Sequence, residues 1–176
     1  MSVYLITGSS GAGKTAVAEE LQRRGYTAYN TDTMPEVTSL YDMATGEAIS
    51  LQNWPPAPLD TSRYHWNWDL QALRKLFDSG DPVFIAAITS NTKENLHLFD
   101  SVFVINPTME TIMHRLITRT NNNIGKHPDE LAGILESHAK SAAMWQSLGA
   151  TLVDGDQSLG KVVDTILCHI KSGPPG

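Results

Sequence analysis

The sequence predicts an α/β fold in which helices cover both faces of a five-stranded parallel sheet. Short apolar runs alternate with segments of helical periodicity along the chain, which is typical of a mostly parallel sheet. The apolar runs show little polar alternation, as expected of strands that are covered on both faces. The predicted strands are residues 3–7, 27–30, 83–88, 101–105 and 150–153.

Helices are predicted between and after these strands. The first starts directly at a Gly-rich turn and stops at Gly25, a residue type that commonly follows a helix end. The third is expected to turn Met109 and Met113 inward. In the last helix, Cys168 is expected to be a small buried hydrophobe. The predicted helices are residues 14–24, 69–79, 108–118, 129–148 and 159–170.

The chain is expected to form a single domain over residues 1–176. This length is close to that of one domain, and 41% apolar residues suffice for a core.

Two segments depart from the alternation of strands and helices. Residues 31–68 hold three of the four tryptophans and lack clear strand periodicity, and residues 119–128 are polar and lie between two helices. Loops as long as the first segment are usually functional, disordered or locally helical.

The charge and the cysteine content exclude several classes of protein. The net charge is −6 and no basic run occurs, which argues against a nucleic-acid partner and requires any anionic ligand to be held locally. No apolar run approaches the roughly 20 residues of a membrane span, and the N-terminus lacks a signal-peptide pattern. We therefore expect no membrane partner and a cytoplasmic location. A single cysteine excludes an intrachain disulfide. No pattern in the sequence indicates an oligomeric state.

A phosphate-binding motif lies between the first strand and the first helix. The motif requires Gly, four residues, Gly, Lys and Ser or Thr, and residues 8–15 match it. Glycines let backbone N–H groups surround phosphate oxygens, and the helix N-terminus adds positive potential. Lys14 is predicted to reach the β- and γ-phosphates, and the Thr15 hydroxyl to bind Mg²⁺. A Gly-rich turn without a ligand is the alternative. The candidate nucleotide-binding residues are Gly8, Ser9, Ser10, Gly11, Ala12, Gly13, Lys14 and Thr15.

With this motif the chain resembles the nucleoside monophosphate kinase and shikimate kinase group of P-loop small-molecule kinases, within the broader AAA-like P-loop ATPases. The resemblance covers nearly the whole length, from the N-terminal P-loop to a last strand followed by one helix. It implies a three-layer P-loop NTPase fold in which an insertion at residues 31–68 binds an acceptor and residues 119–128 form a lid. It also implies ATP and Mg²⁺ as cofactors, and phosphoryl transfer to a nucleoside, a nucleotide or a similar metabolite.

The acceptor side of this resemblance depends on Asp32. The group often carries Asp-x-Asp after strand two, where the first carboxylate helps to hold Mg²⁺ through water and the second orients or deprotonates the acceptor hydroxyl. Here the stretch reads Asn30-Thr31-Asp32, so only the second carboxylate is present. Asp32 is therefore the candidate general base or acceptor anchor, and Asn30 is at most a weak metal ligand. The alternative role for Asp32 is to cap a helix or turn.

Two arginines and one loop complete the predicted nucleotide site. Arg115 and Arg119 lie four residues apart, and so on one helix face. In the group this helix brings arginines over the transferring phosphoryl group, which makes both candidate catalytic residues and Arg119 a nucleotide contact. A solvated helix face is the alternative. After the last strand, Gly155 and Gln157 lie in what looks like the group's adenine-side loop, or simply in a turn that caps the final helix.

Four further residues are candidate acceptor contacts. Arg63 and Trp66 lie in the aromatic part of the insertion, where a ring and a cation could bind a planar or anionic acceptor. Ser90 and Asn91 follow the third strand, at the sheet edge where α/β ligands bind. Their alternative roles are structural, because tryptophans are more often core residues and because Ser and Asn often cap helices.

A second function stays open at this point. The protein could be a module that binds ATP or GTP, or an ATPase, without small-molecule kinase activity. The third predicted strand has no acid at its end, where many P-loop enzymes carry one, and Asn30 replaces an aspartate. The two arginines before the lid favour the kinase, because a pure binding module has less need of them.

Overall fold

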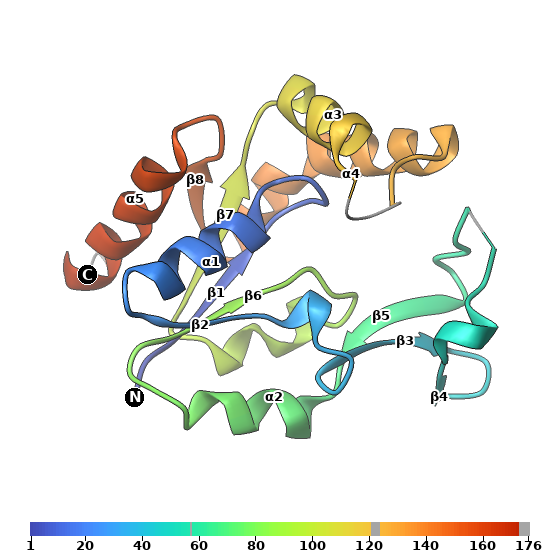
Figure 1. Cartoon of the computed structure of the whole chain (residues 1–176), viewed down its shortest axis with the longest axis horizontal. Helices are drawn as coiled ribbons and strands as arrows, with labels where there is room; N and C mark the ends of the chain where they lie inside the picture. Colours follow the sequence, from blue (N-terminus) through green and yellow to red (C-terminus); the bar gives the residue numbers. More distant parts are fainter. Residues whose placement is uncertain (57, 121–123, 173–176) are drawn as a thin grey trace.

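The main sheet of the protein is parallel and five-stranded. The computed structural model describes residues 1–56, 58–120 and 124–172. Within them, the strand order is β2-β6-β1-β7-β8, so the first strand of the chain lies in the centre (Figure 1). These strands are β1 (Val3–Thr7), β2 (Thr27–Asn30), β6 (Val83–Ala86), β7 (Ser101–Asn106) and β8 (Thr151–Asp154). The predicted fold class and the five predicted strands are therefore confirmed.

The parallel pairing places the carboxyl ends of all the strands of the main sheet at the same edge. Leu5 of β1 lies opposite Ile85 of β6 on one side and opposite Val102 of β7 on the other. The pairs β2–β6 and β7–β8 are parallel as well. The residues that follow β1, β2, β6 and β8 therefore meet at the carboxyl edge of the sheet, although they are far apart in the sequence.

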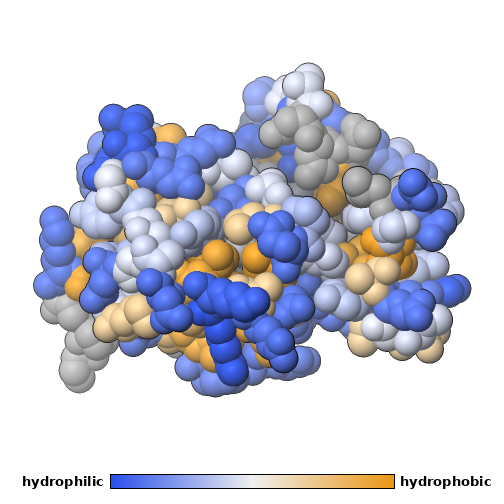
Figure 2. All heavy atoms as spheres, turned by 60° about the horizontal axis from the view of Figure 1, so that its bottom comes forward, coloured by the Kyte–Doolittle hydropathy of each residue, from blue (hydrophilic) through white to orange (hydrophobic). Residues whose placement is uncertain are grey.

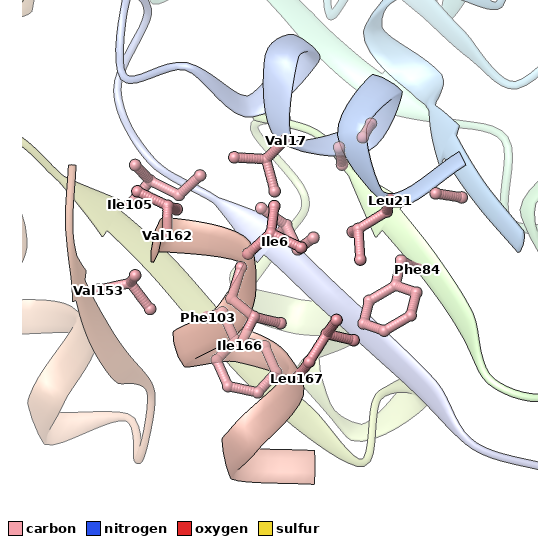
Figure 3. Close-up of a cluster of buried hydrophobic side chains, with 14 of the residues drawn as sticks. Ile6, Val17, Leu21, Phe84, Phe103, Ile105, Val153, Val162, Ile166 and Leu167 are labelled. Atoms are coloured by element: carbon pink, nitrogen blue, oxygen red, sulfur yellow. The ribbon is translucent and has the colours of Figure 1, made fainter. Parts of the chain in front are cut away.

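Helices cover both faces of the sheet, so that helices, sheet and helices form three layers. Neighbouring residues of a strand point to opposite faces. Ile6 joins the core beneath α1 and α5, whereas Leu5 joins the core beneath α2. Figure 3 shows the first of these cores, in which α1 and α5 lie over the sheet. The predicted helices are confirmed. They are α1 (Lys14–Arg23), α2 (Leu70–Phe77), α3 (Met109–Thr118), α4 (Pro128–Ser147) and α5 (Leu159–Ser172).

Two expectations about helix faces were wrong. Met109 and Met113 of α3 are 47% and 40% exposed, because this helix buries only the narrow stripe of Ile112 and Leu116. Leu116 packs against the P-loop: a Cβ added at Gly11 would lie 3.1 Å from its Cγ. Cys168 is exposed, because it lies outside the buried stripe of α5.

Residues 31–68 contain a second sheet, which the sequence pattern concealed. The strands β3 (Thr38–Asp42), β4 (Glu47–Ala48) and β5 (Tyr64–Trp68) form an antiparallel sheet in the order β4-β3-β5. Alternation is present in β3, but two of its three buried positions hold Thr38 and Asp42 rather than apolar residues. The expectation that this segment lacks strands was therefore wrong. A binary apolar pattern does not recognise strands whose inward positions are polar.

The second sheet is fastened to the carboxyl edge of the main sheet. Trp68 of β5 is buried, and its indole N–H donates to Thr31 Oγ1 at 2.9 Å. Thr31 opens η1 (Thr31–Thr33), the short 3₁₀ helix that follows β2. The N–H of Ser90, which follows β6, donates to the carbonyl of Trp66 at 2.7 Å. Residues after β2 and β6 thus place β5 beside the P-loop edge (Figure 1).

Polar residues make up most of the face of the molecule that Figure 2 shows. Figure 2, which turns the α2 side of the molecule forward, shows apolar residues in patches surrounded by polar ones. In the described part of the chain, none of the helices has the length and apolarity that crossing a membrane requires.

Candidate nucleotide and acceptor site

The turn between β1 and α1 has the backbone of an anion-binding loop. Gly8, Gly11 and Gly13 have positive φ values of 143°, 83° and 109°. A Cβ at Gly8 would lie 2.5 Å from the carbonyl oxygen of Ile105, so the chain has no room for a side chain there. The loop ends where α1 begins at Lys14. Since the first N–H groups of a helix lack intrahelical partners, this end of α1 favours an anion.

Lys14 is buried at the mouth of this loop. Its Nζ donates to the carbonyl oxygens of Gly8 at 2.9 Å and Ser9 at 3.2 Å. Burial lowers the pKa of Lys14, the nearby Asp32 carboxylate raises it, and Arg119 lowers it. The loop therefore holds the Lys14 side-chain nitrogen against two main-chain carbonyls, at the position where the motif expects phosphates.

Thr15 and Asn30 form a polar pair at the start of α1. The exposed Thr15 accepts a hydrogen bond at Oγ1 from Asn30 Nδ2 at 3.0 Å. The other amide atom, Asn30 Oδ1, is buried and has no partner among the described residues. An unpaired buried carbonyl oxygen beside a hydroxyl suits the water shell of Mg²⁺, a cation that keeps several of its waters. The described residues contain no cluster of three His, Cys, Asp or Glu side chains that could hold a metal, so nucleotide oxygens and water would complete this site.

Asp32 lies where three elements converge. It belongs to η1, and its two carboxylate oxygens accept from the N–H of Ile88, which follows β6, at 3.1 and 3.2 Å. The indole N–H of Trp66 in β5 donates to Oδ1 at 3.4 Å. Burial raises the pKa of Asp32, while Lys14 and these hydrogen bonds lower it. The side chain is thus bound across elements instead of capping η1, and it interacts electrostatically with the P-loop lysine.

The two arginines of the predicted lid helix lie against the P-loop but differ in their bonding. Arg115 donates to the carbonyls of Ala12 at 2.9 Å and Gly155 at 3.0 Å, and so links the P-loop to the loop after β8. Arg119 donates from Nη2 to Ser10 Oγ at 3.2 Å and to the carbonyl of Ile124. Its Nε is buried without a hydrogen-bond partner in the described structure, and burial lowers its pKa. Arg119 therefore keeps a donor for a further ligand.

The loop after β8 is built around Gly155. A Cβ at this residue would lie 2.8 Å from the ring of Pro107, so only glycine allows the loop to approach β7. Its carbonyl faces Arg115, which places the main chain of Gly155 close to the P-loop. Gln157 is exposed, and its amide donates to Asp154 Oδ2 at 2.8 Å within the same loop.

The other candidate acceptor contacts separate into two groups. Trp66 is half-buried and donates a hydrogen bond to Asp32. The exposed Ser90 lies next to Trp66, because its main-chain N–H donates to the Trp66 carbonyl. The side-chain amide of Asn91 accepts from the N–H and donates to the carbonyl of Trp68, so it fastens β5 in place. Arg63 lies at the far end of β5, where its guanidinium binds Asp42 through Nε and Nη2. The Arg63 guanidinium is thus paired with Asp42, three residues and roughly 10 Å along the chain from Trp66.

One residue of the site escaped the sequence analysis. His138 of α4 is buried, its Nδ1 lies 2.9 Å from Ser9 Oγ, and its Nε2 lies 2.8 Å from the carbonyl of Pro107. A carbonyl only accepts, so Nε2–H is the donor and, in the neutral ring, Nδ1 accepts from the Ser9 hydroxyl. No motif indicates this contact, because 129 residues separate the two partners.

Three solved structures have the same fold. A shikimate kinase from Acinetobacter baumannii in complex with shikimate matches with a TM-score of 0.64 and 16% identity, over 98% of this chain and 94% of that one. A deoxyadenosine kinase from M. mycoides with bound dATP matches with a TM-score of 0.56 and 12% identity, over 96% and 99%. A gluconokinase from Sinorhizobium meliloti 1021 matches with a TM-score of 0.54 and 18% identity, over 95% and 90%.

The family follows from the sequence itself. No curated protein sequence matches the chain. The model of an AAA domain family, AAA_18, matches residues 5–136, which include the P-loop, the second sheet, Arg115 and Arg119. This match spans well over half of the chain and agrees with the P-loop fold of the solved structures. The chain therefore belongs to the AAA_18 family of AAA domains.

Proposed function

We propose that the protein is a P-loop kinase that transfers the γ-phosphoryl group of ATP, with Mg²⁺, to a small acceptor. The observation that carries this proposal is the placement of Asp32 beside Lys14 at the carboxyl edge of the sheet. Nucleotide binding requires Lys14 but not a carboxylate next to it, whereas transfer to an acceptor uses both. The kinases of shikimate, gluconate and deoxyadenosine that share the fold support this assignment.

In the proposed reaction the P-loop N–H groups and Lys14 bind the β- and γ-phosphates. The acceptor hydroxyl lies against Asp32, and its oxygen attacks the γ-phosphorus while the bond to the β-phosphate oxygen breaks and ADP leaves. The hydroxyl proton passes to the Asp32 carboxylate. Arg119 places its unpaired donor near the charge that spreads over the transferred group.

The metal side of the site involves Thr15 and Asn30. Thr15 Oγ1 would bind Mg²⁺ directly, and Asn30 Oδ1 would accept a hydrogen bond from a water of the metal. When bound, Mg²⁺ neutralises charge on the β- and γ-phosphate oxygens. A carboxylate would hold the same water more strongly than the amide does.

Two segments take the acceptor and exclude water in this proposal. Residues 31–68, with β3 and β5, form the acceptor side, and residues 119–128 form a lid over the phosphates. The described ends of the lid are linked, since Lys126 Nζ donates to the carbonyls of Ile117 and Arg119. Asn121, Asn122 and Asn123 of the predicted lid lie outside the described residues. Lid closure would keep water from the reacting phosphate.

The competing function is an ATP-binding module or ATPase without an acceptor. Asn30 favours it, because an amide in place of a carboxylate weakens metal binding. The arrangement of Asp32 and Arg119 at the P-loop favours the kinase. We therefore place the module second.

One experiment separates the two functions. The protein is incubated with Mg²⁺-ATP and single compounds from a panel of nucleosides, nucleoside monophosphates, sugars and sugar acids, and ADP release is measured. We expect one class of acceptor to stimulate ADP release, and Lys14→Ala to abolish it. Lys140→Ala, which changes an exposed lysine of α4, is the matched control and should leave the rate unchanged. ATP binding without stimulation by any acceptor would favour the module.

A further inference from the structure

Two large apolar residues contact the half-buried Asp32. Trp66 and Ile88 donate hydrogen bonds to its carboxylate, Trp66 through its indole N–H and Ile88 through its main-chain N–H. Ile88 is 41% exposed, and Trp54, whose ring centroid lies 6.2 Å from that of Trp66, is 46% exposed. We call Trp54, Trp66 and Ile88 the Asp32 surface. Aromatic and aliphatic groups left open beside a catalytic carboxylate gain free energy when a ligand covers them.

The acceptor segment carries almost no positive charge. Residues 31–68 contain five acids, Asp32, Glu36, Asp42, Glu47 and Asp60, but only one Lys or Arg, which is Arg63. The Arg63 guanidinium binds Asp42 through two nitrogens and lies 5.1 Å from the ring centroid of Tyr64. Asp42 thereby pairs with the one Lys or Arg side chain of this segment.

The cations at the P-loop belong to the nucleotide side. Lys14 and Arg115 are held against P-loop carbonyls, and Arg119 contacts the P-loop serine Ser10. ATP brings several negative charges to these same groups. A phosphate or carboxylate on the acceptor would therefore meet the charge of ATP on one side and of the acidic segment on the other.

From the proposed function together with this charge distribution, we propose that the acceptor is an uncharged hydroxyl compound with a planar ring, of which nucleosides are the accessible examples. Its ring would lie on Trp54, Trp66 and Ile88, and its hydroxyl would reach Asp32. The neutral ring gains contact area on the Asp32 surface without a counter-ion. Nucleoside monophosphates and sugar acids lack the cation they would need.

The test compares pairs of acceptors that differ only in charge. ADP release is measured with each nucleoside and with its 5′-monophosphate at equal concentrations of Mg²⁺-ATP, and gluconate and shikimate are included. We expect at least one nucleoside to exceed its monophosphate about 10-fold or more in kcat/KM. A preferred monophosphate or sugar acid would overturn the inference and leave the kinase assignment intact. A turnover that no acceptor stimulates would count against the proposed function.

A binding measurement keeps the inference testable without turnover. Tryptophan emission is titrated with the nucleosides and their monophosphates in the absence of ATP. We expect a nucleoside to quench the emission saturably. Trp54→Ala should bind the same nucleoside several-fold more weakly. Leu148→Ala, which changes another exposed apolar residue far along the chain, is the control and should bind as the unchanged protein does. Stronger quenching by the monophosphates, or equal binding by Trp54→Ala, would contradict an uncharged ring acceptor on this surface.

Discussion

The hydroxyl of Ser9 in the P-loop lies 2.9 Å from Nδ1 of His138, a buried residue of α4. The same imidazole donates from Nε2 to the carbonyl of Pro107, directly after β7. One side chain therefore connects the phosphate loop, the central sheet and the helix that follows the predicted lid. Ser9 is positioned by tertiary structure as well as by the glycines around it.

Replacing His138 is expected to weaken both stability and nucleotide binding. His138→Ala leaves the Pro107 carbonyl unpaired and a cavity beside the P-loop, so the free energy of unfolding should fall by about 2 kcal/mol. The KM for ATP should rise more than kcat falls, because Ser9 loses its support. His114→Ala, at an exposed position of α3, is the control. A double-mutant cycle with Ser9→Ala should show a coupling of about 1 kcal/mol, and strict additivity would refute the link.

Substitutions of Arg115 in α3 and of Arg119 at its C-terminal end are expected to have different effects. Arg119→Ala removes the group with a spare donor at the P-loop, so kcat should fall about 100-fold or more with little change in stability. Arg115→Ala leaves the carbonyls of Ala12 and Gly155 unpaired, so its main effect should be a loss of about 1–3 kcal/mol in the free energy of unfolding. Urea titration and steady-state kinetics on both variants separate these outcomes. Equal effects on kcat would contradict the assignment.

The acid limb of the activity is expected to report Asp32. Because burial raises the pKa of this carboxyl above its ordinary value of 3.8, kcat/KM should fall on acidification with an apparent pKa above 3.8. Asp32→Asn should lower kcat/KM by about 10²–10⁴-fold and remove this limb. A profile for Asp32→Asn with the same acid limb as the unchanged protein would exclude Asp32 as the base.

The raised pKa of Asp32 also has a consequence for stability. The folded protein holds this proton more tightly than the unfolded chain, so the stability from protonated Asp32 is complete below pH 3.8 and is lost as the pH rises through the folded pKa. At neutral pH, Asp32→Asn should therefore be more stable than the unchanged protein, and the difference should shrink on acidification. Thermal unfolding at several pH values measures this difference.

Asn30→Asp is expected to strengthen the metal site. The substitution replaces Nδ2, which donates to Thr15 Oγ1, by a carboxylate oxygen that can accept from the Thr15 hydroxyl. It keeps an oxygen at the position of the unpaired Oδ1, where a metal-bound water can donate to a full carboxylate. The Mg²⁺ concentration for half-maximal activity should fall several-fold, while the KM for ATP at saturating Mg²⁺ changes little. Asn67→Asp, in β5, provides a comparison variant with the same change in charge. An unchanged Mg²⁺ requirement would place the metal away from Asn30.

Much of the fold depends on residues that are close together in the sequence, and this part could be predicted. Apolar runs and helical spacing determine strands and helices of the main sheet, and the P-loop is recognisable because its glycines, lysine and threonine are contiguous. The resemblance to P-loop small-molecule kinases indicated Asp32, and the structure brings it to the carboxyl edge because it lies two residues after the parallel strand β2. The second sheet was missed, since Thr38 and Asp42 occupy two of the three buried positions of β3.

The sequence by itself determined the fold class, the phosphate loop and the residues at the strand ends, because each depends on contiguous residues and on the common direction of parallel strands. Tertiary structure alone decided which side chains are available for chemistry. It bound Arg63 to Asp42, used Asn91 to hold β5, and brought His138 to Ser9. Such pairings depend on the packing of elements distant in sequence, where charge and hydrogen-bonding capacity are shared among neighbours that no local pattern identifies.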